Sequence, residues 1–106
     1  MGYVYLICDP SQNTYKIGVT RNIVQKRLKK LQTGNSSELH IVNTVETKYP
    51  FRLETLLHNK YKHKKVYGEW YNLSDDEVKS FKSTCDNLIN IMDSMSDNPF
   101  FMKSIK

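Results

Sequence analysis

The sequence predicts an α+β domain in which helices flank a small mixed or antiparallel sheet of three strands. Two observations predict this class. Two short runs rich in β-branched and aromatic residues open the chain with turn formers between them, which is typical of an antiparallel hairpin. Leucines and other apolar residues then recur at helical spacing in two later segments, which is typical of helices that pack on a sheet.

A single domain is expected, because 106 residues are enough for one compact core. Hydrophobic residues make up 39% of the chain and charged residues 25%, so the composition excludes disordered and fibrous classes. We expect this domain to occupy residues 1–93, and residues 94–106 to form a tail.

The opening hairpin is predicted at residues 3–8 and 14–19, because the residues between them, Asp-Pro-Ser-Gln-Asn, favour a turn. A first helix is expected from about residue 22 to residue 31, followed by a third strand over residues 39–45.

A second helix is predicted from residue 50 to about residue 64, since Pro50 suits a first helical turn and leucines follow at helical spacing. Residues 68–73 are interpreted as a short strand or extended turn. Ser74 and Glu77 fit a capping box before a long apolar stripe, so residues 74–93 predict one long helix that covers the sheet.

Targeting and membrane segments are not expected. Apolar stretches are only a few residues long, and the first residues lack the basic region of a signal peptide. We therefore predict a soluble intracellular protein, in cytoplasm or nucleus, that is not secreted and has no membrane partner. Cys8 and Cys85 lie far apart outside any ligand motif, so they are interpreted as buried thiols.

The positive charge is concentrated in the first two-thirds of the chain. Residues 1–68 hold twelve Lys and Arg against four Asp and Glu, whereas the net charge of the whole chain is +5. Such a field favours a polyanion, because phosphates neutralised by Lys and Arg release counterions. A solvated basic surface without a nucleic-acid role remains the alternative.

Arg27 does not fit a purely structural interpretation of the first helix. At about 100° per residue, it falls inside the arc of the apolar residues, where an unpaired charge is costly. It could extend past the core or pair with a structural carboxylate. It could also clamp a phosphate, for which its planar guanidinium is suited.

The second helix presents Glu54 and His58 four residues apart, so both lie on one side beside the leucines. A surface carboxylate paired with a lysine is the ordinary interpretation of Glu54. Mg²⁺ needs only one or two protein carboxylates when phosphate and water complete its shell, so Glu54 could also hold a metal ion.

The segments Tyr3-Val4-Tyr5 and Lys16-Ile17-Gly18 resemble the two half-motifs that name the GIY-YIG nuclease superfamily. Tyr3 replaces the first Gly, and Lys16 replaces the second Tyr. The Lys-Ile-Gly form is typical of a phage- and virus-type subfamily described as a DNA-binding domain.

Later segments extend the resemblance, which covers residues 2–73. Arg27 occupies the place of the family arginine on the following helix. Glu54 with Leu57-His58 is similar to the family's Glu-x-x-Leu-His helix, and Gly68-Glu69-Trp70-Tyr71 is similar to its Gly-Glu-Trp-Phe element.

The resemblance implies a GIY-YIG-like fold with an extra C-terminal helix, and a one-metal hydrolysis of phosphodiester bonds. It implies that Tyr5 helps deprotonate or orient the attacking water and that Lys16 assists. Arg27 would stabilise the charge of the scissile phosphate. Glu54 would hold a single Mg²⁺ or Mn²⁺ ion against the leaving oxygen. We therefore expect these four side chains to converge on one concave face.

Other residues are candidates for supporting roles. His40, His58 and Asn72 are possible catalytic support, whereas Leu31 stands where many catalytic members place His. Trp70 is interpreted as core. DNA contacts are expected from the lysines of the two helical segments, namely Lys26, Lys29, Lys30, Lys60, Lys62, Lys64 and Lys65.

Three functions are compatible with these observations. The first is a metal-dependent DNA endonuclease acting on duplex or branched DNA. The second is a DNA-binding module that kept the fold but cleaves weakly or not at all. The third is a protein-interaction adaptor that uses Phe100, Phe101 and Met102 of the tail as a contact.

Overall fold

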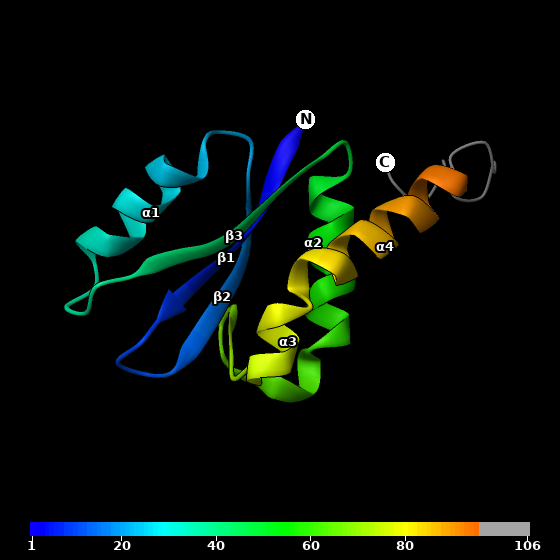
Figure 1. The fold of residues 1–106 in the computed structure, drawn as a ribbon. Helices are drawn as coiled ribbons and strands as arrows, with labels where there is room; N and C mark the ends of the chain where they lie inside the picture. The colour runs from blue at the N-terminus through cyan, green and yellow to red at the C-terminus, as the bar shows by residue number, and fades with distance from the viewer. Residues whose placement is uncertain (96–106) are drawn as a thin grey trace.

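The computed structural model describes residues 1–95 as a five-stranded antiparallel sheet with helices on both faces. The strand order is β3-β1-β2-β5-β4. Helix α1 (Val24–Thr33) lies on one side of the sheet, and the other helices lie on the opposite side (Figure 1). The predicted α+β class is confirmed.

The predicted hairpin forms the centre of the sheet. β1 (Gly2–Asp9) pairs with all of β2 (Thr14–Thr20), from Tyr3 opposite Thr20 to Asp9 opposite Thr14. β3 (His40–Thr47) pairs with the other edge of β1. These are the three strands that the sequence predicts.

The sheet has two more strands than predicted. β4 (Lys65–Tyr67) and β5 (Trp70–Tyr71) form a small hairpin, and β5 pairs with β2 only at Tyr15 and Lys16. Strands of three and two residues are too short to show an alternating pattern, so the sequence indicated only one extended segment here. Gly68 has a φ of 51° in the connecting turn, a conformation that glycine adopts without strain.

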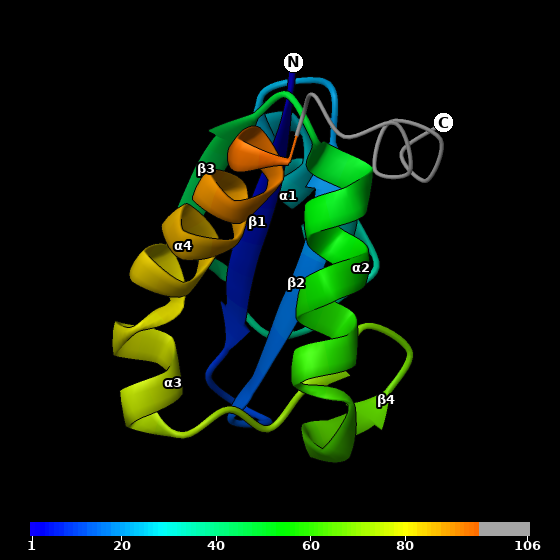
Figure 2. The same cartoon turned by 90° about the vertical axis from the view of Figure 1, so that its right-hand side faces the viewer.

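The helices on the second face also depart from prediction at their ends. α2 (Pro50–Lys60) ends earlier than predicted, and a short 3₁₀ turn, η1 (Lys62–Lys64), follows it. The long helix expected over 74–93 is divided at Ser80 into α3 (Asp75–Lys79) and α4 (Phe81–Ser94). The predicted capping box of Ser74 and Glu77 is present at the start of α3. Figure 2 shows α2 and α4 side by side over the sheet.

Residues at alternating positions of β1 belong to two different cores. Val4 and Leu6 pack with α2 and α4, and Tyr5 and Ile7 pack with Val24 of α1. Cys85 is buried as predicted, but Cys8 is half-buried rather than buried, and both are free thiols. Tyr5, the first of the predicted site residues in the chain, therefore points to the α1 side of the hairpin.

The predicted tail begins at residue 94, but α4 includes Ser94. Phe100, Phe101 and Met102 lie outside the described residues, as does most of the expected tail. In the described part of the chain, every helix is too short or too polar to cross a membrane.

The contact between Tyr5 and Gly18 predicts the cost of a side chain at position 18. A Cβ added at Gly18 would collide with the Tyr5 ring and hydroxyl, whereas a Cβ at Gly34 would meet nothing within 4 Å. We expect Gly18→Ala to lower the free energy of unfolding by about 1–3 kcal/mol, as overpacked core positions do. Gly34→Ala should be near neutral. Equilibrium urea unfolding measures both, and equal stabilities of the two variants would contradict this packing.

Candidate active site

The candidate site lies at the edge of β2, just beyond the point where β5 ends. There the backbone N–H of Ile17 donates to the carbonyl oxygen of Glu69 at 3.2 Å. The carbonyl oxygen of Ile17 lies 2.9 Å from Nε2 of His58, so Nε2 carries the proton and donates. These two hydrogen bonds bring α2 and the β4–β5 turn to the same point of β2.

Glu54, His58 and Glu69 form a compact group at this point. One ligand atom from each residue lies within 4.8 Å of the others, and all three residues are half-buried. Glu54 and His58 are neighbours one turn apart on α2, and Glu69 comes from the turn before β5. The group therefore combines two carboxylates and one imidazole, which can bind a divalent cation.

The environment of Glu54 disfavours its negative charge. Burial raises the pKa of the Glu54 carboxyl, and the nearby Glu69 raises it further. His58 and Lys16 oppose this shift without cancelling it. A positive ion beside the two carboxylates would relieve the repulsion between them.

Lys16 is already paired with one of these carboxylates. Its Nζ atom lies 2.9 Å from Oε1 of Glu69 and 5.8 Å from the centre of the Trp70 ring. Trp70 is buried, as predicted. The Lys16 ammonium is thus held between the β5 strand and the carboxylate group.

Tyr5 links this group to α1. Its ring is 2% exposed, and its hydroxyl lies against Gly18, directly opposite in the β1–β2 register. Burial raises the pKa of Tyr5 to about 12; Arg27 opposes the shift, and Glu69 and Glu54 add to it. Charges from α1, α2 and the β4–β5 turn therefore all act on one hydroxyl, which stays protonated at neutral pH.

Arg27 is half-buried and lines a hollow of about 80 Å³ with other residues of α1 and of the segment before it. These other lining residues are Thr20, Asn22, Lys26 and Lys30. Within residues 1–95 its guanidinium makes no hydrogen bond or ion pair with a carboxylate, so the structural pairing considered for Arg27 is not found there. The hollow presents three positive charges to an anion.

Several predicted residues lie away from this site. His40 is exposed on β3, where it pairs with Cys8, and β1 separates β3 from β2. Asn72 follows β5 with its side chain exposed, and only its backbone N–H is bonded, to the carbonyl of Lys64. Leu31 packs against the α1-side core.

The predicted DNA-binding lysines separate into different environments. Lys26 and Lys30 line the Arg27 hollow, and Lys29 is exposed on the same helix. Lys64 is paired with Glu77 at 3.4 Å, and the Lys60 ammonium lies 5.9 Å from the Tyr61 ring centre. Lys62 and Lys65 are exposed.

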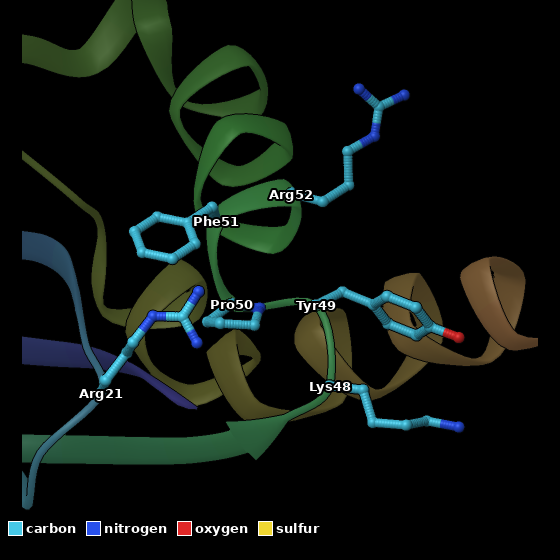
Figure 3. Close-up of a pocket in the computed structure, with 6 residues that line it drawn as sticks. All are labelled: Arg21, Lys48, Tyr49, Pro50, Phe51 and Arg52. Atoms are coloured by element: carbon cyan, nitrogen blue, oxygen red, sulfur yellow. The ribbon is translucent and has the colours of Figure 1, made fainter. Parts of the chain in front are cut away.

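The sequence did not indicate a second basic hollow, of about 160 Å³, at the start of α2. It is lined by Arg21, Lys48, Tyr49, Pro50, Phe51 and Arg52. Arg21 and Phe51 face one another, with 4.9 Å between the guanidinium carbon and the ring centre (Figure 3). The residues that line this hollow come from a turn, the end of a strand and the start of a helix, so no periodic pattern in the sequence connects them.

Tyr71 was also not singled out. Burial raises the pKa of its hydroxyl, and the negative charges of Glu69 and Glu54 raise it further. Its ring also lies 5.5 Å from the His58 ring, between centres.

Comparison with protein families gives one match. Residues 2–86 match the family model described as the T5orf172 domain. The matched range contains Tyr5, Lys16, Arg27, Glu54 and Glu69. Neither the curated proteins nor the solved structures gave a match.

The repulsion between Glu54 and Glu69 predicts that removing one charge stabilises the metal-free protein. In chelator at neutral pH, Glu54→Gln should raise the thermal unfolding midpoint by a few degrees, because function-related charges often cost stability. Glu46→Gln, at an exposed position of β3, should leave the midpoint unchanged. Differential scanning calorimetry measures both midpoints. A Glu54→Gln protein that unfolds at a lower temperature than the parent would contradict the repulsive environment.

Proposed function

The chain belongs to the T5orf172 domain family, and from this membership and the geometry of the site we propose that it is a metal-dependent DNA endonuclease of the GIY-YIG type. The observation that carries the proposal is the group of Glu54, His58 and Glu69 at the β2 edge, whose ligand atoms lie within 4.8 Å of one another. Arg27 and Glu54 come from helices on opposite faces of the sheet, and the charges of both influence the pKa of the Tyr5 hydroxyl. A site for phosphodiester hydrolysis needs such a combination of a phosphate-binding cation and a metal-binding carboxylate.

The residues at the β2 edge fit one hard divalent cation, Mg²⁺ or Mn²⁺. Carboxylate oxygens are the ligands that these ions prefer, and Mg²⁺ is commonly held by one or two of them. Glu54 would hold the ion. When bound, the ion would stabilise the negative charge that develops on the leaving oxygen.

The other residues have roles that follow from their charge and position. Burial raises the pKa of Tyr5 to about 12 in the metal-free protein, which supports a role in orienting the attacking water by hydrogen bonding. Arg27 has its guanidinium available for two oxygens of the scissile phosphate. Lys16 contributes a second positive charge, which lies beside Glu69.

The basic hollows support a path for the DNA backbone. The Arg27 hollow is lined by Thr20 and Asn22, and the second basic hollow, at the start of α2, is lined by Arg21, so the β2–α1 connection contributes to both. Together they present Arg21, Lys26, Arg27, Lys30, Lys48 and Arg52. A backbone lying along this connection would have its phosphates neutralised on the way to the site.

A DNA-binding module with weak or no cleavage is the second candidate. Leu31 favours it, because this residue packs into the α1-side core and supplies no proton-transfer group one turn after Arg27. The basic hollows would serve that function equally well.

Cleavage assays separate the two candidates. With Mg²⁺ or Mn²⁺ and supercoiled, branched or single-stranded DNA, we expect the parent to cleave and Glu54→Gln to lose activity by orders of magnitude while binding is retained. Arg27→Ala should lose about 100-fold or more in rate and also bind less tightly, because it removes a phosphate contact. Glu46→Gln is the matched control. Cleavage by Glu54→Gln at the parent rate would contradict the metal assignment, and a parent that binds without cleaving would favour the binding module.

Salt dependence tests the proposed DNA path. Each phosphate contact contributes about −0.9 to the slope of log K against log salt, so Lys26→Gln and Lys30→Gln should each make the slope less steep by about that amount. Lys82→Gln is the control, because Lys82 lies on α4 and is paired with Asp86 at 2.8 Å. Fluorescence anisotropy over a salt series measures the slopes. If Lys82→Gln reduces the slope of log K against log salt more than the α1 variants do, the DNA lies on another face.

A further inference from the structure

We propose that Glu69 is a second carboxylate ligand of the cation, with His58 as the third ligand, and that Lys16 is the group that Glu69 releases when the cation binds. This inference rests on the proposed nuclease function and adds to it a ligand set and an exchange of partners. Three features of the β2 edge support it.

The first feature is the exposure of the Glu69 side chain, which is 43% accessible and so has room to rotate. Neighbouring ligand atoms around Mg²⁺ or Mn²⁺ are about 3 Å apart at metal–oxygen distances near 2.1 Å. One ligand atom from each of Glu54, His58 and Glu69 lies within 4.8 Å of the others, so side-chain rotations, including that of Glu69, would bring them to these distances.

The second feature is the orientation of His58. Its Nε2–H donates to the Ile17 carbonyl at 2.9 Å, which leaves Nδ1 as the nitrogen with a lone pair. A backbone carbonyl that accepts from one ring nitrogen is a common partner of a histidine whose other nitrogen binds a metal. The Tyr71 ring, centred 5.5 Å away, helps hold the imidazole in place.

The third feature is the ion pair between Lys16 and Glu69. An ammonium 2.9 Å from Oε1 of Glu69 supplies the positive charge that this carboxylate needs in the metal-free protein. A divalent cation at the same carboxylate would repel the ammonium and supply a larger charge. Lys16 would then keep its contact with the Trp70 ring, at 5.8 Å, and its ammonium would be available to a DNA phosphate.

The ligand set also indicates which ion is preferred. Two carboxylates alone suit Mg²⁺, whereas an added imidazole nitrogen favours a transition metal such as Mn²⁺. We therefore expect Mn²⁺ to bind more tightly than Mg²⁺ and expect His58 to be the residue that makes this difference.

Direct metal binding without DNA tests the proposal. Isothermal titration of Mn²⁺ should show that Glu54→Gln and Glu69→Gln each weaken binding by about tenfold or more, and that Glu46→Gln does not. Lys16→Met should tighten Mn²⁺ binding, because it removes the competing cation. His58→Ala should weaken binding of Mn²⁺ more than binding of Mg²⁺. Thermal midpoints in chelator verify that each variant is folded.

The possible failures can be told apart. If Glu54→Gln weakens Mn²⁺ binding and Glu69→Gln does not, the metal site of the proposed function stands and Glu69 is not a ligand. If Lys16→Met weakens binding, the exchange is wrong. If the folded parent binds neither ion at millimolar concentration, both this inference and the metal-dependent function are overturned.

Discussion

β5 is only two residues long, so the β2 edge that faces away from β1 loses its strand partner after Lys16, and the backbone of Ile17 must find other hydrogen-bond partners there. A buried backbone group left without a partner costs about 1–3 kcal/mol. The carbonyl of Glu69 and the imidazole of His58 supply the two partners. The hydrogen bonds of the Ile17 backbone therefore hold α2 and the β4–β5 turn beside each other. This placement brings Glu54, His58 and Glu69 together.

Gly18 extends this edge to the other face of the sheet. Because Gly18 has no side chain, the Tyr5 ring lies across it and the hydroxyl reaches the place where α1 and α2 both act. A larger residue at position 18 would collide with the Tyr5 ring and displace its hydroxyl from this place. Packing against the Tyr5 ring therefore requires a glycine at this position of the second half-motif, and the same packing positions the Tyr5 hydroxyl.

Patterns that repeat along the chain could be predicted from the sequence, and features that depend on relative placement could not. The β1–β2 hairpin and helix α2 follow from alternation and helical spacing. The position of Arg27 on the core-facing side of α1 follows from the helical periodicity of that segment. The break at Ser80 was not predicted, because the apolar stripe of Val78, Phe81 and Cys85 continues through it.

The same distinction holds for the site. The resemblance identified the segment that contains Glu69, but the approach of this carboxylate to Glu54 depends on where the short hairpin of β4 and β5 packs. His40 was considered for its residue type, yet the pairing of β3 with β1 rather than β2 keeps it from the β2 edge. Strand order is a property of the whole chain, and a single residue carries no signal for it.

The charges at the β2 edge are only partly balanced in the free protein. Lys16 neutralises Glu69, but Glu54 remains beside it with a raised pKa, and Arg27 has no carboxylate partner in residues 1–95. A cation would neutralise the two carboxylates, and a phosphate would neutralise Arg27 and the released Lys16. Because each ligand changes the charge that the other meets, their binding free energies would be coupled, and such coupling is reciprocal. The unequal pairing of four charges is therefore a physical reason for metal and DNA to bind this edge together.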